Sequence, residues 1–477
     1  MENIDAVREE LIGMLGPEQV ANDAATLETH AADRWMARGR ADLVVFARHT
    51  QDVSRVMHYC STNNIPVTPR GAGVGYVGGA TPVQGGLVLS LARMNRILEI
   101  HPEDFVAVVE PCVITGELQS ACRQQGLFYP PDPASLKECS IGGNISTNAG
   151  GPRCLKYGVT RNYVLGLQVV LPDGRILEAG GRTHKNKTGF DLVGMFVGAE
   201  GLLGIVTRAT LRLLPHPPQC ATLSAAFPTP EAACAAVQAV LHAGFLPSAL
   251  EVADGFTLQA AREFVGASRV PSGDAHLLVE LDGQEATVQT ETKMVAAILR
   301  NAGALELETA QGETESARLW ELRRLFSQSL KASGLVKLNE DVTVPRSRLV
   351  DLMRFAGELQ QRFDVPVATF GHAGDGNLHV NLMVKDYDDA AVKERMMEAL
   401  DALFQQIIEW GGAVTGEHGI GVAKMRWWPK ALPEVTRDFH DQLKQFLDPA
   451  GVLNPGKFVK NPADRKPECE KTESIER

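Results

Sequence analysis

Three polar, glycine-rich segments in the first half of the chain constrain its fold more than any other feature. They are "PRGAGVGYVGG" (69–79), "SIGGNISTNAGGPR" (140–153) and "FVGAEGLLGIVT" (196–207). Glycine allows successive backbone N–H groups to turn towards one anion, and such a cluster of donors binds phosphate. A single segment of this kind can equally be a turn-rich linker. Several in one domain favour one extended ligand that carries phosphate.

The first segment also contains Gly73, Gly75 and Gly78 in the spacing G-x-G-x-x-G. In a Rossmann dinucleotide-binding unit this motif opens a helix, and an acidic residue follows about 20 positions later. Here "ATPVQGG" follows, which cannot begin a helix, and the corresponding later residue is Arg93. The sequence therefore excludes a Rossmann fingerprint, while phosphate binding stays the prediction.

The apolar pattern predicts two folded domains. Short apolar runs predict strands at 43–47, "IPVTP" and "GLVLSL", and the Asp-Gly pair of "VLGLQVVLPDGRILEAG" predicts a hairpin. "PHPPQ" (215–219) marks a boundary, after which strands such as "HLLVEL" and "VPVATFGH" alternate with amphipathic helices. We expect a helical lead-in (1–40), a first domain (41–217), a second domain (218–420), a C-terminal segment returning to the first domain (421–460) and a disordered tail (461–477).

Composition narrows the class of protein. The chain has 477 residues, of which 44% are apolar and 22% charged, and it contains no apolar run long enough for a membrane span. Its N-terminus lacks the basic and apolar regions of a secretory signal, so we expect a cytoplasmic protein. A net charge of −11 argues against nucleic-acid binding. Eight cysteines without a C-x-x-C pair argue against a thiolate zinc site or an iron–sulfur cluster.

Two later segments predict a metal site. In "GHAGDGNLHVNLM" (371–383) the apolar residues alternate after the glycines, so a strand places His379 and Asn381 on its other face, and His372 can reach the same point. Glu417 of "TGEHGIG" (415–421) would complete an open three-ligand site of the kind that catalytic zinc prefers. The alternative is that these histidines cap turns and bond to the backbone.

His418 directly follows the proposed ligand Glu417. Adjacent side chains of an extended segment point to opposite sides, so both residues cannot easily bind one ion. A histidine beside a metal but not bound to it is a suitable general base, because its pKa lies near neutrality. A purely structural histidine is the alternative.

Together these motifs resemble the vanillyl-alcohol oxidase / p-cresol methylhydroxylase flavoprotein family, in its D-2-hydroxy-acid dehydrogenase branch. The resemblance covers about residues 40–458. It implies an α+β fold, with a two-subdomain FAD-binding domain of the p-cresol methylhydroxylase type, then an α+β substrate domain with an antiparallel sheet and a C-terminal helical segment. By the same resemblance the FAD-binding residues would be Arg70, Gly71, Ala72, Gly73, Val74, Gly75, Gly142, Gly143, Asn144, Asn148, Glu200, Gly204 and Ile205. Members that bond FAD covalently usually carry a histidine in the first loop, and 69–80 contains none, so we predict a dissociable FAD.

The resemblance also implies residue roles in the second half. The branch uses the two histidine-bearing segments as metal ligands, which supports His372, His379 and Glu417. Arg323 and Lys337 match positions that hold the substrate carboxylate, for which the arginine fork is well suited. Read alone, either cation would be a solvated surface charge. Asn381 and Ser327, the latter one helical turn after Arg323, complete the predicted substrate-binding set.

The implied reaction is the oxidation of a D-2-hydroxy acid of the D-lactate, D-2-hydroxyglutarate or glycolate class to the 2-oxo acid. His418 would abstract the hydroxyl proton, and hydride would pass to the flavin while the metal acts as Lewis acid and template. The metal is zinc or manganese, because two histidines and a carboxylate suit either. Electrons would leave through an external acceptor, which could be an electron-transfer flavoprotein, a quinone, a cytochrome or an iron–sulfur subunit.

Two other functions stay open at the level of sequence. One is a flavin oxidase or dehydrogenase for another alcohol, in which the metal segments serve only structure. The other is a metal-dependent hydrolase whose glycine loops hold a nucleotide substrate. A peripheral position at the membrane, through the electron acceptor, and a homodimer are also compatible with the sequence.

Overall fold

The computed structural model describes residues 4–460, so the predicted disordered tail lies outside the described residues. The N-terminal part begins with a small sheet in the strand order β1-β2-β4-β3, in which the last three strands run parallel. The helices α1 and α3 pack against it through a shared apolar cluster, and the Asp52 carboxylate starts α3 by accepting the N–H of His49. Its elements are α1 (Ile4–Leu15), β1 (Val20–Ala21), α2 (Ala24–His30), β2 (Leu43–Phe46), α3 (Thr50–Thr62), β3 (Val67–Arg70) and β4 (Leu87–Ser90).

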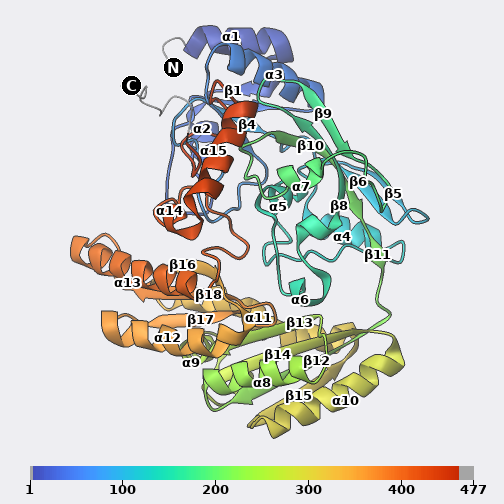
Figure 1. Cartoon of the computed structure of the whole chain (residues 1–477), viewed down its shortest axis with the longest axis vertical. Helices are drawn as coiled ribbons and strands as arrows, with labels where there is room; N and C mark the ends of the chain where they lie inside the picture. Colours follow the sequence, from blue (N-terminus) through green and yellow to red (C-terminus); the bar gives the residue numbers. More distant parts are fainter. Residues whose placement is uncertain (1–3, 461–477) are drawn as a thin grey trace, which may run out of the picture.

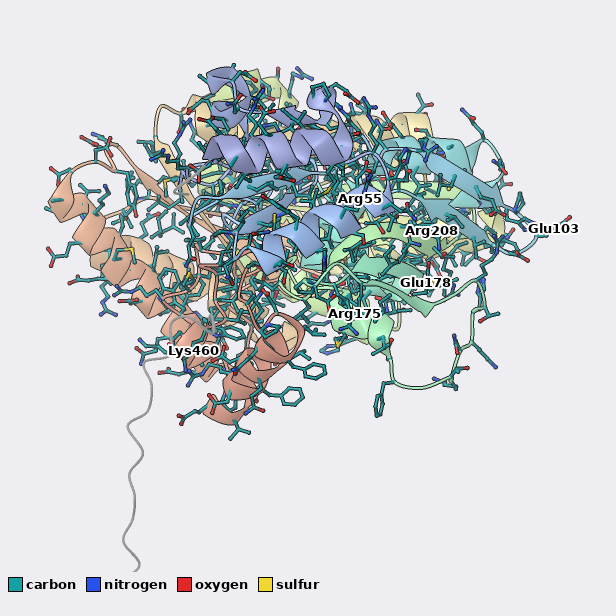
Figure 2. The ribbon with its side chains drawn as sticks, turned by 90° about the horizontal axis from the view of Figure 1, so that it is seen from above. Arg55, Glu103, Arg175, Glu178, Arg208 and Lys460 are labelled. Carbon is teal, nitrogen blue, oxygen red and sulfur yellow. The ribbon has the colours of Figure 1, made fainter. Side chains whose placement is uncertain are left out.

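A second, antiparallel sheet follows in the order β5-β6-β10-β8-β9. Its last two strands form the predicted hairpin, with Gly174 in the turn at a φ of +92° that favours glycine. Arg208 and Glu178 of this sheet form a partly exposed ion pair, and both are labelled in Figure 2. The elements are β5 (Ile97–His101), β6 (Val106–Val109), α4 (Thr115–Arg123), β7 (Leu127–Phe128), α5 (Ile141–Thr147), α6 (Cys154–Tyr157), β8 (Val164–Val170), β9 (Ile176–Gly180), α7 (Leu192–Phe196), β10 (Ile205–Arg212) and β11 (Leu214–Pro215).

The C-terminal part is built on a seven-stranded sheet in the order β15-β12-β14-β13-β17-β18-β16, and every neighbouring pair is antiparallel. The predicted second α+β sheet is thus confirmed. Its strands are β12 (Gln219–Phe227), β13 (Ala249–Asp254), β14 (Ala275–Gly283), β15 (Glu306–Gln311), β16 (Val336–Thr343), β17 (Val367–His372) and β18 (Asn377–Val384).

The two faces of the seven-stranded sheet differ in chemistry. One face is apolar and is covered by four helices, α8 (Pro230–His242), α10 (Glu285–Asn301), α12 (Leu349–Phe363) and α13 (Ala390–Glu409). The other face carries most of the buried polar side chains of these strands and is partly covered by α9 (Gly255–Val265) and α11 (Gly312–Ala332). In Figure 1 this sheet forms the lower part of the molecule, below the two smaller sheets.

After α13 the chain returns to the N-terminal part, as Figure 1 shows for α14 (Trp428–Ala431) and α15 (Glu434–Leu447). The N–H of Val67 in β3 bonds to the carbonyl of Val452 at 2.8 Å, and the N–H of Asn454 bonds back to the carbonyl of Val67 at 2.7 Å. The buried ammonium of Lys444 donates to the carbonyl of Leu202. The segment 415–421 therefore lies where the chain crosses between the two parts. Within residues 4–460, no helix is long and apolar enough to cross a bilayer.

Candidate flavin and metal site

A cavity of about 310 Å³ lies where the three glycine-rich segments meet. Residues that sequence reasoning did not identify also line it, among them Asp33 and Tyr76, and so do Glu417 and His418. The predicted cofactor residues on its wall are Arg70, Gly71, Ala72, Gly73, Val74, Gly75, Gly142, Gly143, Asn144, Glu200, Gly204 and Ile205. Asn148 does not line this cavity, because it caps the end of α5 with its side-chain oxygen turned to the N–H of Arg161.

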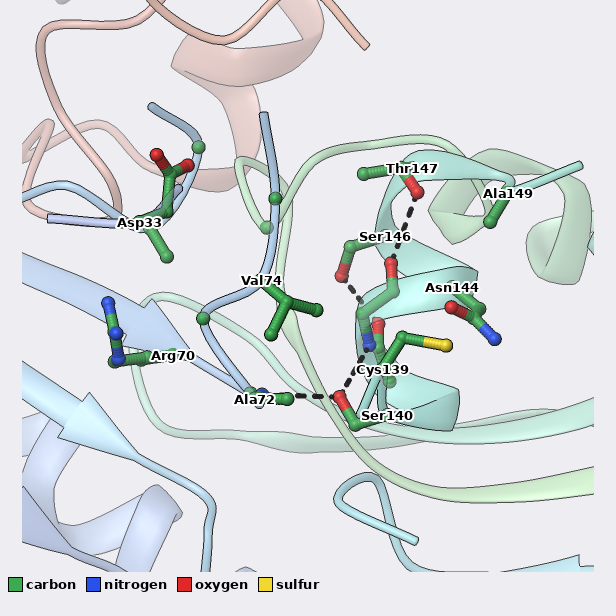
Figure 3. Close-up of a pocket in the computed structure, with 18 of the residues that line it drawn as sticks. Asp33, Arg70, Ala72, Val74, Cys139, Ser140, Asn144, Ser146, Thr147 and Ala149 are labelled. Carbon is green, nitrogen blue, oxygen red and sulfur yellow. Dashed lines mark hydrogen bonds between the residues drawn. The ribbon is translucent and has the colours of Figure 1, made fainter. Parts of the chain in front are cut away.

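Ser140 joins the first two glycine-rich loops (Figure 3). Its hydroxyl accepts the N–H of Ala72 at 3.4 Å and the N–H of Gly143 at 3.3 Å. A Cβ on Gly71 would lie only 2.7 Å from this hydroxyl, so glycine permits the close approach of the two loops. The two loops therefore form one wall of the cavity, rich in backbone N–H groups, which fits a dinucleotide cofactor such as FAD.

His372, His379 and Glu417 converge on one point. Each offers a ligand atom, and these atoms all lie within 4.8 Å of one another. Nε2 of His372 is 3.8 Å from Oε2 of Glu417, and Nε2 of His379 is 3.5 Å from Oε1. Two ligands of a tetrahedral zinc, each about 2.1 Å from the ion, are about 3.4 Å apart. The three side chains therefore fit a small divalent cation.

The pKa values of Glu417 and His379 suit a cation, whereas His372 would have to release a proton on binding one. Burial raises the pKa of the Glu417 carboxyl, but the neighbouring histidines outweigh burial and bring that pKa to about 2. Burial lowers the pKa of His379 to about 3, so its ring is neutral. Burial likewise acts to lower the pKa of His372, but the Glu251 and Glu417 carboxylates hold it well above its usual value. Two of the three ligands are thus in their metal-binding form at neutral pH.

Four adjacent strands place the site on the polar face of the sheet. Glu251 of β13 pairs in register with His372 of β17, and Asp341 of β16 pairs with His379 of β18. Oε1 of Glu251 lies 2.6 Å from Nδ1 of His372, which fixes the ring and leaves Nε2 for a metal. Sequence reasoning missed both acids. The available signal was a carboxylate within an apolar strand, as in "ALEVAD".

His418 lies between two rings. Its imidazole stacks on Tyr76 of the first glycine-rich loop, with ring centres 5.5 Å apart, and on His379, 5.6 Å apart. Its Nε2 is 3.8 Å from Oε1 of Glu417, and it is not one of the three converging ligands. His418 therefore lies beside the metal-binding point and also faces the flavin cavity.

The predicted substrate-binding residues lie on or against the same polar face. Nε of Arg323 in α11 donates to Oε2 of Glu251 at 2.6 Å, which leaves its two terminal nitrogens without a hydrogen-bond partner among the described residues. Nζ of Lys337 in β16 donates to the Ser327 hydroxyl at 2.9 Å, and burial lowers the pKa of Lys337 to about 8. Asn381 is fully buried, and its Oδ1 accepts no hydrogen bond within the described residues. The structure thus keeps donors and an acceptor unpaired beside the metal-binding point.

The fold and the family matches together define the class of protein, a FAD-linked oxidoreductase. Residues 41–180 match the family described as "FAD binding domain", and residues 216–458 match "FAD linked oxidases, C-terminal domain". The chain belongs to the FAD-linked oxidase family of the p-cresol methylhydroxylase type, in the branch that contains glycolate oxidase subunit GlcD and D-lactate dehydrogenase.

The similar proteins match over nearly their whole length. The chain is 39% identical to glycolate oxidase subunit GlcD of Bacillus subtilis (strain 168), over 96% of this chain and 98% of that protein. It is 34% identical to a D-lactate dehydrogenase of Anaerostipes hadrus, over 90% of this chain and 92% of that protein. Among solved structures, p-cresol methylhydroxylase with substrate bound superposes with a TM-score of 0.81 at 19% identity, covering 98% of each chain. The predicted fold class and family are confirmed.

Proposed function

We propose that the protein oxidises a D-2-hydroxy acid of the glycolate, D-lactate or D-2-hydroxyglutarate class to the 2-oxo acid, with FAD and a divalent cation. The relatives named glycolate oxidase subunit and D-lactate dehydrogenase act on 2-hydroxy acids by name. One structural observation carries the proposal. Glu417 belongs to the three converging ligands and also lines the flavin cavity, so a metal-bound substrate would meet the flavin.

Each residue has a role that its position supports. Bound FAD would supply an acceptor for two electrons, and a cation at His372, His379 and Glu417 would supply Lewis acidity for the substrate oxygens. The free guanidinium nitrogens of Arg323 and the ammonium of Lys337 would hold the substrate carboxylate. These contacts orient the substrate so that its hydroxyl faces His418, which takes the hydroxyl proton.

Several finer points are part of the proposal. The cation is zinc or manganese, the FAD is dissociable, and an external acceptor removes the electrons, which agrees with the word "subunit" in the relatives' names. Membership of the FAD-linked oxidases argues against the hydrolase. A different alcohol substrate with a structural metal would leave the unpaired Oδ1 of Asn381 and the free nitrogens of Arg323 without a role.

Anaerobic flavin reduction tests the proposal. Purified protein is mixed with a panel of glycolate, D- and L-2-hydroxy acids and simple alcohols, and the flavin absorbance is followed before and after chelation. We expect bleaching by glycolate, which is achiral, or by at least one D-2-hydroxy acid, loss of bleaching on chelation with the flavin retained, and recovery on adding zinc or manganese. Reduction that is insensitive to metal removal, or that occurs only with simple alcohols, would refute the proposal.

A further inference from the structure

The segment 415–421, which carries Glu417 and His418, has no helix or strand of its own. All six of its backbone N–H groups from 416 to 421 donate to side-chain oxygens. Asp341 receives the first three through a single carboxylate oxygen, at 2.8–3.0 Å, and the Thr415 hydroxyl receives the fourth. Two acids and one hydroxyl therefore replace the hydrogen bonds that a helix or a strand would provide.

The last two N–H groups bond to Glu200, which belongs to the third glycine-rich segment of the N-terminal part. Ile420 donates to Oε1 and Gly421 to Oε2, both at 2.8 Å. Glu200 itself has a φ of +50°, a backbone conformation uncommon for a non-glycine residue. A Cβ on Gly419 would lie 2.8 Å from the Glu200 carboxylate, so the loop packs directly on this side chain.

The two acids come from different parts of the molecule. Asp341 is on β16 of the substrate domain, and Glu200 immediately precedes the turn into β10 beside the flavin cavity. Their N–H donors, at 416–418 and 420–421, lie on one short loop, so the loop is held between the two domains. Burial raises the pKa of Glu200 to about 7, although the N–H groups of Ile420 and Gly421 act in the opposite direction, so above pH 7 the side chain is mainly a carboxylate. A carboxylate that accepts N–H groups fixes their direction as well as their distance, and it is stronger than a neutral acceptor.

We propose that Glu200 is a positioning residue that aligns the metal-and-base loop with the flavin, through the backbone of Ile420 and Gly421. The structural part of this inference rests on hydrogen bonding alone. Its catalytic part rests on the proposed function. It assigns Glu200 a task other than binding the cofactor. Val77 of the first glycine-rich loop supports the same alignment, because its carbonyl accepts the N–H groups of Val422 and Ala423.

The test compares Glu200→Gln with the wild-type holoenzyme at about pH 8.5, where Glu200 is ionised. An amide has one oxygen, so it can satisfy only one of the two N–H groups, and its NH₂ opposes the other. Hydrogen exchange measured by mass spectrometry on a peptide covering 414–424 should accelerate about tenfold or more. Anaerobic flavin reduction should slow about 10- to 100-fold, with little change in the substrate concentration for half-saturation, because a misaligned base affects the chemical step.

Asn454→Gly is the matched control. The Asn454 side chain donates to the carbonyl oxygens of Glu200 and Gly79. The substitution therefore removes polar contacts at the same junction without touching 415–421. Glycine tolerates the φ of +47° at this position. We expect normal exchange in the 414–424 peptide and normal flavin reduction from this variant.

Glu200→Asp keeps the charge with a shorter reach and serves if Glu200→Gln does not fold. Faster exchange at 414–424 in either variant, with flavin retained, supports the proposal. Unchanged exchange in that peptide overturns it, and so does loss of flavin with unchanged exchange, which would make Glu200 a cofactor ligand. The exchange measurement needs no substrate, so it decides this proposal even if the protein oxidises no 2-hydroxy acid.

Discussion

Strand β18 buries side chains on both of its faces, but one face is apolar and the other is polar. Leu378, Val380 and Leu382 are fully buried on the side covered by helices, within the largest apolar cluster. His379 and Asn381, on the other side, are 9% and 0% exposed, yet Nδ1 of His379 and Oδ1 of Asn381 have no hydrogen-bond partner within the described residues. The two faces are therefore alike in burial, and the polar face differs in having buried atoms without hydrogen-bond partners.

The difference indicates that the two faces of this strand have different roles. Burying apolar side chains against helices is favourable, and each fully buried leucine contributes about 1.5–3 kcal/mol. An unpaired buried polar atom costs about 1–3 kcal/mol, so a fold that keeps such atoms gives up stability for them. We infer that the helix-covered face supplies stability and the polar face keeps donors and acceptors for ligands. Variants of the two faces should then separate stability from activity.

The largest separation is expected from Glu417→Gln on the polar side. Removing the only carboxylate among the three converging ligands should reduce metal content and slow flavin reduction, and a Lewis-acid contribution of about 4 kcal/mol corresponds to about 10³-fold. The midpoint of thermal unfolding should change little. Glu409→Gln, an exposed carboxylate at the end of α13, is the control and should behave as wild type. Full activity of Glu417→Gln without bound metal would mean that the three converging ligands hold no catalytic metal.

Leu382→Ala on the apolar side should give the reverse result. The cavity left in the core should lower the free energy of unfolding by about 2–5 kcal/mol, as measured by denaturant unfolding. Leu382→Met keeps the volume and should cost less than about 1.5 kcal/mol. Metal content and the rate of flavin reduction in the folded fraction should remain normal for both variants. A large loss of activity in folded Leu382→Ala would show that the two faces are not independent.

The sequence predicted the two faces of β18 better than it predicted the acids that contact the polar face. The alternation in "NLHVNLMV" predicted which residues of β18 share a face, because period-two patterns are local. The supporting acids could not be predicted in the same way. Glu251 bonds to His372 from 121 residues away, and Asp341 reaches the 415–421 loop from a strand whose register depends on the complete sheet. Local patterns report which face a side chain occupies, while strand pairing decides what it meets.

Tyr76 and Glu200 illustrate the same limit within the glycine-rich segments. Both lie in motifs that predict phosphate binding, and both line the cavity. The ring of Tyr76 nevertheless stacks on His418, and the side chain of Glu200 accepts the backbone N–H groups of Ile420 and Gly421. A motif for cofactor binding therefore also contains residues that contact the other domain, and only the packing of the two domains identifies them.

The smallest expected effect is a pH dependence of KM, which tests the role of Lys337 on the polar face. This residue lies on the polar face of β16, and burial, aided by the charge of Lys331, lowers its pKa to about 8. The ammonium is charged below pH 8 and loses its proton above it. If that charge holds the substrate carboxylate, KM should be lowest below pH 8 and should rise about tenfold per pH unit above it. The lowered pKa also means that folding is penalised below pH 8, and the penalty disappears as the pH approaches the ordinary lysine value of 10.5. Lys337→Arg stays charged throughout, so its KM should be independent of pH in this range. A wild-type KM that is flat from about pH 7 to 9.5 would remove Lys337 from the substrate-binding set and leave it as a buried partner of Ser327.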